Sequence, residues 1–228
     1  MKKFIQLGLL AALAGGSVHG NTVSFTNGTT TAAGGVSSLV SNPAGVTVTG
    51  YFSNSGTTAW YGASVAQDSL GLGTVGISGL DTSLEGTWHE FLLLDFGATA
   101  TGSVQINSLV LNYPSNNGTT ITPQSPYFKY AWVSGVPTPG NPSAGGITSW
   151  TTAGTNATPL TSDLYTFSSL PGRGRYLLIG AVNGSLSTSN YFQLNSLTYT
   201  SVPDGASTLA LMGAALATLG FAARRRKL

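Results

Sequence analysis

Short apolar stretches alternate with clusters of Gly, Ser, Thr and Asn along most of this chain. In "VTVTGYF" (residues 46–52), Val46, Val48 and Phe52 alternate with polar or small residues, as expected for a strand with one buried face. "FLLLDF" and "YLLIGAV" are apolar at consecutive positions, which predicts central strands buried on both faces. No long segment has apolar residues at helical spacing. The pattern therefore predicts strands joined by turns.

Eight segments are predicted to be strands: "NTVSF", "VTVTGYF", "TTAWYGASVA", "WHEFLLLDF", "SVQINSLVLNY", "PYFKYAWVSG", "RYLLIGAV" and "NYFQLNSLTYTSV". Turn clusters such as "SNSG", "PSNNG" and "VNGS" separate them and tolerate positive φ. This number and spacing of strands predict an all-β fold, an antiparallel β-sandwich of the jelly-roll type. The proline-rich residues 137–159 are expected to form a long loop with one short strand. Residues 21–200 are expected to form one domain, because the part after this loop is too short for its own core.

The first 20 residues have the pattern of a secretory signal peptide. Lys2 and Lys3 precede an apolar stretch (residues 4–14), and small or polar residues follow. The apolar stretch is shorter than the roughly 20 residues that a membrane span needs. We therefore predict export across the inner membrane, with cleavage after Gly20.

The last 28 residues combine a short motif, an apolar segment and a basic end. Residues 207–223 contain no charge and would rise about 25 Å as a helix, close to the thickness of a hydrocarbon core. The terminal Arg224, Arg225, Arg226 and Lys227 would stay on the cytoplasmic side. The sequence thus predicts a transmembrane helix over 207–223 that holds the exported domain at the inner membrane.

The motif before this segment is Val202-Pro203-Asp204-Gly205. In this order, with an apolar helix and an arginine cluster following, it resembles the PEP-CTERM family of bacterial sorting signals, in the variant that begins Val-Pro-Asp. The resemblance covers residues 201–228 and implies recognition by an exosortase-type membrane transpeptidase. That enzyme would cut near the motif and pass the protein to the cell surface or the extracellular space. A plain membrane anchor is the alternative, but it does not explain the motif. The preceding domain is similar in layout to the generic extracellular domain often found before such signals.

Most of the positive charge lies at the two ends of the chain. Between residues 21 and 200, only Lys129, Arg173 and Arg175 are basic, against six acidic residues, so this part carries a net charge of −3. Nucleic acid is therefore not an expected partner, because phosphate binding needs a basic surface.

No catalytic residue is predicted. The chain contains no cysteine, which excludes thiol nucleophiles and cysteine metal sites. Outside the signal peptide the only histidine is His89, and no G-x-S-x-G segment presents a serine to it. We interpret His89 in "TWHEFLL" as a strand histidine. A pair of carboxylates such as Glu85 and Glu90 leaves a glycan-acting enzyme as an alternative.

Two other kinds of site have candidates. Asp81, Ser83 and Glu85 alternate in "DTSLEG", as calcium ligands do in a loop, but the twelfth position is Leu92, so an EF-hand is excluded. An acidic turn between strands is the other interpretation of this segment. No other metal ligand and no cofactor is predicted.

Trp150 is the aromatic residue least easily assigned to a core and is a candidate contact for a sugar ligand. Arg173 and Arg175 in "LPGRGRY" are either a solvated turn or a site for an anion or a partner. We expect a non-enzymatic surface or matrix protein with a structural or adhesive role in exopolysaccharide or biofilm. The alternative is a protein like a carbohydrate-binding module, with calcium as an option.

Overall fold

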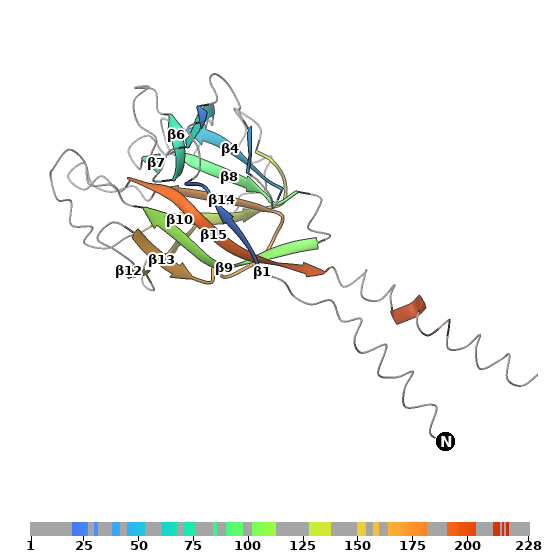
Figure 1. Ribbon diagram of the computed structural model, residues 1–228. Coiled ribbons are helices and arrows are strands. Elements are labelled where there is room, and N and C mark those ends of the chain that lie inside the picture. The colour runs from blue at the N-terminus through green and yellow to red at the C-terminus, as the bar shows by residue number, and fades with distance from the viewer. Residues whose placement is uncertain are drawn as a thin grey trace, which may run out of the picture.

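A computed structural model gives the fold of the chain (Figure 1). It describes residues 20–26, 30–31, 38–41, 45–52, 61–67, 71–75, 84–85, 90–97, 102–112, 128–137, 150–153, 157–159, 164–181, 191–203, 212–214, 216 and 218. All statements on structure below concern these residues.

The described part consists almost entirely of antiparallel strands, which confirms the all-β prediction. Their bounds are β1 (Gly20–Ser24), β2 (Thr30–Thr31), β3 (Ser38–Ser41), β4 (Val46–Phe52), β5 (Tyr61–Gln67), β6 (Leu72–Val75), β7 (Leu84–Glu85), β8 (Phe91–Asp95), β9 (Gly102–Asn112), β10 (Phe128–Val133), β11 (Thr151–Ala153), β12 (Ala157–Pro159), β13 (Leu164–Ser168), β14 (Tyr176–Ala181) and β15 (Tyr191–Pro203).

The strands form one hydrogen-bonded sheet. Its order is β11-β10-β14-β8-β4-β5-β6-β15-β9-β13-β12, and β1 and β7 pair with β15, β2 with β5, and β3 with β4. The sheet curls at β5, which pairs with β4 through Tyr61, Gly62 and Ala63 and with β6 through residues 64–67. Two halves result: β4, β8, β14 and β10 in one, and β15, β9 and β13 in the other.

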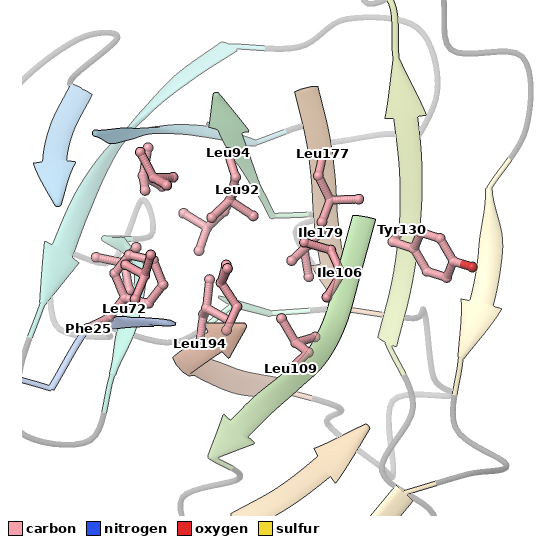
Figure 2. Close-up of a cluster of buried hydrophobic side chains, with 14 of the residues drawn as sticks. Phe25, Leu72, Leu92, Leu94, Ile106, Leu109, Tyr130, Leu177, Ile179 and Leu194 are labelled. Carbon is pink, nitrogen blue, oxygen red and sulfur yellow. The ribbon is translucent and has the colours of Figure 1, made fainter. Parts of the chain in front are cut away.

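The main core lies between these two halves. Figure 2 shows Leu92 and Leu94 of β8 and Ile179 of β14 on one side, and Ile106 of β9 and Leu194 of β15 on the other. All five side chains are completely buried. Burial of apolar area in this core, at about 25 cal/mol per Å², is the main force that holds the curled sheet closed.

The half built from β4, β8, β14 and β10 is apolar on both faces. Its second face carries a smaller cluster of buried residues, which we call the outer layer: Tyr51, Phe91, Leu93, Ala131, Val133 and Leu178, with Trp150 and Tyr176 packed against them. β8 lies between β14 and β4, and β14 lies between β10 and β8. The consecutive apolar residues of "FLLLDF" and "YLLIGAV" therefore do form central strands with two buried faces, as predicted.

The two ends of the domain lie side by side (Figure 1). Gly20, the first residue of β1, is paired with Thr200 of β15, and β15 continues to Pro203, which pairs with Gly102 of β9. Val202 and Pro203 of the predicted sorting motif thus belong to the last strand rather than to a separate segment. Of residues 207–223, the structure describes only 212–214, 216 and 218, which are helical. Among all described residues, no helix has the length and hydropathy needed to cross a membrane.

Candidate binding groove

Residues 169–175, which we call the arginine turn, connect β13 to β14. Pro171 and Gly172 occupy its tip, and Gly172 has φ +89°, a value that favours glycine. The order Pro-Gly suits a type II turn, in which proline fixes φ at the second position and glycine supplies a positive φ at the third. The turn begins with two backbone hydrogen bonds to β9, from Ser169 N–H to the Asn107 carbonyl (2.7 Å) and from Leu170 N–H to the Ile106 carbonyl (3.2 Å).

The arginine turn packs on the indole of Trp132 in β10. The indole Nε1–H donates a hydrogen bond to the Pro171 carbonyl at 3.0 Å. A Cβ atom at Gly172 would lie 2.7 Å from Cδ1 of the ring, and one at Gly174 would lie 2.9 Å from Cε3. Only glycine fits at these two positions, so the backbone of the turn approaches the ring closely.

The second half of the turn is also held by backbone hydrogen bonds. Gly174 and Val104 of β9 exchange two of them, at 2.9 and 3.1 Å, and the Phe96 N–H donates to the Arg175 carbonyl at 3.2 Å. The backbone between β13 and β14 is therefore tied to β9, to β10 through Trp132, and to the end of β8. The side chains of this turn are largely exposed, including those of Arg173 and Arg175, so the turn is solvated and also fixed in place.

Arg175 forms a two-point ion pair with Asp95, the last residue of β8. Its Nε donates to Oδ1 at 2.8 Å and its Nη2 donates to Oδ2 at 3.0 Å. Burial alone would raise the pKa of Asp95, but the hydrogen bonds from Arg175 and from the Gly97 N–H outweigh it and lower that pKa. The guanidinium of Arg175 also lies 4.8 Å from the centre of the Tyr176 ring.

These residues border an open groove of about 560 Å³. We call it the arginine groove; it is lined by Trp132, Val133, Ser134, Arg173, Gly174, Arg175 and Tyr176. Arg173 is exposed, and among the described residues no acidic side chain forms an ion pair with it. The lining provides hydrogen-bond donors and positive charge without a carboxylate or a histidine. Its chemistry is that of binding an anion or hydroxyl groups.

A third cation, Lys129 of β10, lies in the outer layer. Its Nζ is 4.8 Å from the centre of the Phe91 ring and 5.2 Å from that of Trp150. Burial lowers the pKa of Lys129 to about 8. Gly180 leaves the space for Phe91, because a Cβ there would lie 2.3 Å from Cδ1 of that ring.

Trp150 is partly buried rather than freely exposed. Its ring stacks on Phe91 with centroids 5.0 Å apart and an interplanar angle of 22°. Our interpretation of Trp150 as the aromatic residue least suited to a core therefore needs correction, because one face of its ring is covered. The expected loop over 137–159 also contains the short strands β11 and β12. The contact of Trp150 with a ligand stays a prediction.

The other candidate residues are not gathered at the arginine groove. Glu90 is 1% exposed, next to Phe91, and Glu85 belongs to β7, which pairs with β15. Asp81, Ser83 and His89 lie outside the described residues, as do Asp204, Gly205 and the basic cluster 224–227. Within the described part of the chain, no three His, Cys, Asp or Glu side chains are grouped to hold a metal. The calcium site over Asp81, Ser83 and Glu85 stays a prediction.

The ion pair between Asp95 and Arg175 was missed by the sequence analysis. The two residues are 80 positions apart, and their approach depends on the register that places Tyr176 opposite Asp95. One signal was available: "FLLLDF" ends on an acid and "RYLLIGAV" begins on a base. In two antiparallel neighbours, the end of one strand lies beside the start of the other.

Comparison with known proteins adds nothing to these observations. No family model, no curated protein and no solved structure matches the chain.

Proposed function

We propose that the chain is an exported bacterial protein, sorted to the cell surface or extracellular matrix by an exosortase-type transpeptidase. One observation supports this most directly: Gly20, where the predicted signal peptide ends, is paired with Thr200, three residues before Pro203. Both predicted targeting segments therefore leave the β domain at the same end. This arrangement suits a domain held between two membrane-directed segments during export, because both segments must reach one membrane.

The domain itself is best described as a sandwich related to the jelly rolls. The single sheet curls so that strands distant in sequence share one core; for example, Phe128 of β10 packs edge-on against Phe167 of β13 at 4.8 Å between centroids. Non-sequential neighbours, such as β4 beside β8 and β9 beside β13, are typical of Greek-key connections. Such a domain needs no disulfide outside the cell because it has an extensive core.

The role we propose for the domain is structural or adhesive, within exopolysaccharide or a biofilm, without catalysis. The arginine groove supports this role because it combines open shape, cationic donors and aromatic walls. A protein like a carbohydrate-binding module is the closest alternative, and the same groove favours it. The two roles would use the same binding chemistry. A structural or adhesive protein holds the matrix together, whereas a protein like a carbohydrate-binding module directs a partner to the polysaccharide.

Fractionation of the producing cells tests the sorting step. We compare the full chain with a deletion of residues 204–228, which keeps all of β15, and with a variant in which Arg224, Arg225, Arg226 and Lys227 are replaced by Gln. We expect the full chain at the surface or in the matrix. The deletion should accumulate in the periplasm, and the Gln variant should be sorted poorly. A deletion variant that distributes like the full chain would refute the sorting proposal.

A further inference from the structure

We propose that the arginine groove binds the carboxylate groups of an acidic polysaccharide, with Arg173 as the residue that contacts the anion. This deepens the proposed function and rests on it, since it names the class of polymer that a surface adhesin would hold. Arg175 is neutralised by Asp95, whereas Arg173 has no acidic partner among the described residues. A single unpaired guanidinium at the edge of a groove attracts one anionic group at a time.

Arg175 contributes by its fixed position. Two of its five N–H groups are used by Asp95, and its side chain is 44% exposed, so the remaining donors are accessible. The ion pair and the ring of Tyr176 hold the guanidinium in one orientation. A carboxylate bound by Arg173 would thus have a second set of ordered donors, from Arg175, at the same groove.

The backbone that carries both arginines is fixed before any ligand arrives. The two hydrogen bonds to Val104, the bond from Trp132 Nε1 and the close approach of Gly172 and Gly174 to the indole all restrict it. A turn that is already ordered loses little conformational entropy on binding, which increases affinity without new contacts. This fixed backbone distinguishes the arginine turn from a flexible surface loop that contains two arginines.

The shape of the groove favours a sugar chain over the other anionic macromolecules. A volume of about 560 Å³ lies in the range of pockets that accept a small molecule, and its open side lets a longer polymer continue beyond it. Nucleic acid is disfavoured because tight binding requires many cationic contacts, and the lining of the groove contains two arginines, one of which is paired with Asp95. A flat lipid surface would engage protruding side chains better than a concave groove.

Binding is measured by calorimetry with the full chain in a neutral detergent, using polygalacturonate as the acidic probe and dextran as the neutral one. We expect polygalacturonate to bind, with an affinity that falls as the salt concentration rises. Dextran should not bind. Arg173→Gln should weaken binding about tenfold or more, since hydrogen bonds to charged groups are the strong ones. Lys227→Gln removes the same charge from the C-terminal basic cluster, outside residues 21–200, and should bind as the wild type does.

Three outcomes would overturn the proposal. They are equal binding of dextran and polygalacturonate, unchanged binding by Arg173→Gln, and binding to phosphatidylglycerol vesicles that Arg173→Gln abolishes while polygalacturonate does not bind. Equal unfolding midpoints of Arg173→Gln and wild type exclude misfolding as the cause of any loss. If the wild type reaches the cell surface but does not bind polygalacturonate, only this inference fails. If it is not sorted there, the proposed function fails whatever the groove binds.

Discussion

Lys129 and Arg175 are both cations that lie against aromatic rings of the same half-sheet, but their surroundings differ. Lys129 sits in the outer layer beside Phe91 and Trp150, where burial lowers its pKa to about 8. Arg175 sits over Tyr176 at the arginine groove, 44% exposed and paired with Asp95, which raises its pKa. The residue types fit these places: a lysine can lose its proton when it is desolvated, whereas an arginine keeps its charge.

The difference shows which of the two cations can donate hydrogen bonds to a ligand. The ammonium of Lys129 is covered by two aromatic rings, and its desolvation favours loss of the proton. The guanidinium of Arg175 stays protonated, is held in one orientation and is partly open to water; Asp95 neutralises its charge, so it offers ordered donors beside Arg173. Four experiments test this contrast between a structural cation and a binding site.

The largest effect is expected from Gly180→Ala in the outer layer. The new Cβ would lie 2.3 Å from Cδ1 of Phe91 and 2.9 Å from the Glu90 carbonyl, so the ring and the strand must both shift. We expect a loss of about 3 kcal/mol in the free energy of unfolding, measured by denaturant titration. Polygalacturonate binding by the folded protein should not change. The control is Gly213→Ala, where no atom lies within 4 Å of the added Cβ.

Gly172→Ala should disturb the groove instead. Its φ of +89° is unfavourable for alanine, and the Cβ would lie 2.7 Å from Cδ1 of Trp132. We expect a loss of about 2 kcal/mol in unfolding free energy. Binding of polygalacturonate should fall several-fold while the pKa of Lys129, followed by NMR, stays near 8. If both glycine variants change both properties, the outer layer and the groove are one site, and the contrast is wrong.

Replacing Arg175 or Lys129 by methionine should change the free energy of unfolding differently. Arg175→Met breaks the pair with Asp95 and should lower the unfolding free energy by about 1 kcal/mol, since the pair is partly exposed and screened. Lys129→Met removes a desolvated charge and places a thioether against two rings, so stability at neutral pH should stay equal or rise. Thermal unfolding at pH 7 measures both. A clear loss for Lys129→Met would mean that the aromatic contacts outweigh the cost of burial.

The last experiment measures the dependence of stability on alkaline pH. Between pH 8 and 10.5 the unfolded chain holds a proton at Lys129 that the folded chain lacks, so stability should rise with pH. Burial raises the pKa of Tyr51 to about 12, and its hydroxyl donates to the Pro137 carbonyl at 2.9 Å. Between pH 10 and 12 the folded chain therefore keeps a proton that the unfolded chain loses, and stability should fall.

The unfolding midpoint should therefore be highest near pH 10. Lys129→Met should abolish the rise below this pH. Tyr51→Phe should reduce the fall above it without removing it, because burial also raises the pKa of Tyr130 and Tyr199. A midpoint that falls steadily from pH 8 would show that Lys129 stays protonated in the folded protein.

The strands of the main core were predictable because the pattern of apolar residues within each short segment indicates which faces are buried. Both central strands have consecutive apolar residues, and each meets one apolar layer per face. β6 ("LGTV") and β13 ("LYTFS") were missed since each is only four or five residues long, although β13 contains Leu164, Tyr165 and Phe167. β11 and β12 were hidden in a proline-rich segment, where pairing with β10 and β13 outweighs local preference.

The groove was less predictable than the fold. The two arginines were noted, but their environment depends on pairings that no short window contains: Asp95 with Arg175, and Gly174 with Val104. The glycines of "PGRG" suggested a turn, and nothing in the sequence indicated that an indole fills the space beneath them. A site that forms through the register between strands distant in sequence cannot be predicted from the residues of one segment.

The bridge between Gly174 and Val104 has a mechanical consequence. Val104 is paired with Ser201, two residues before the end of β15, and these strands share a long antiparallel ladder. If a polymer pulls on the groove while the chain beyond Pro203 is anchored, the force passes from the turn to β9 and then to β15. The central strand β14, which follows the turn directly, shares this load. The domain could then resist traction at one end without unfolding the rest of its sheet.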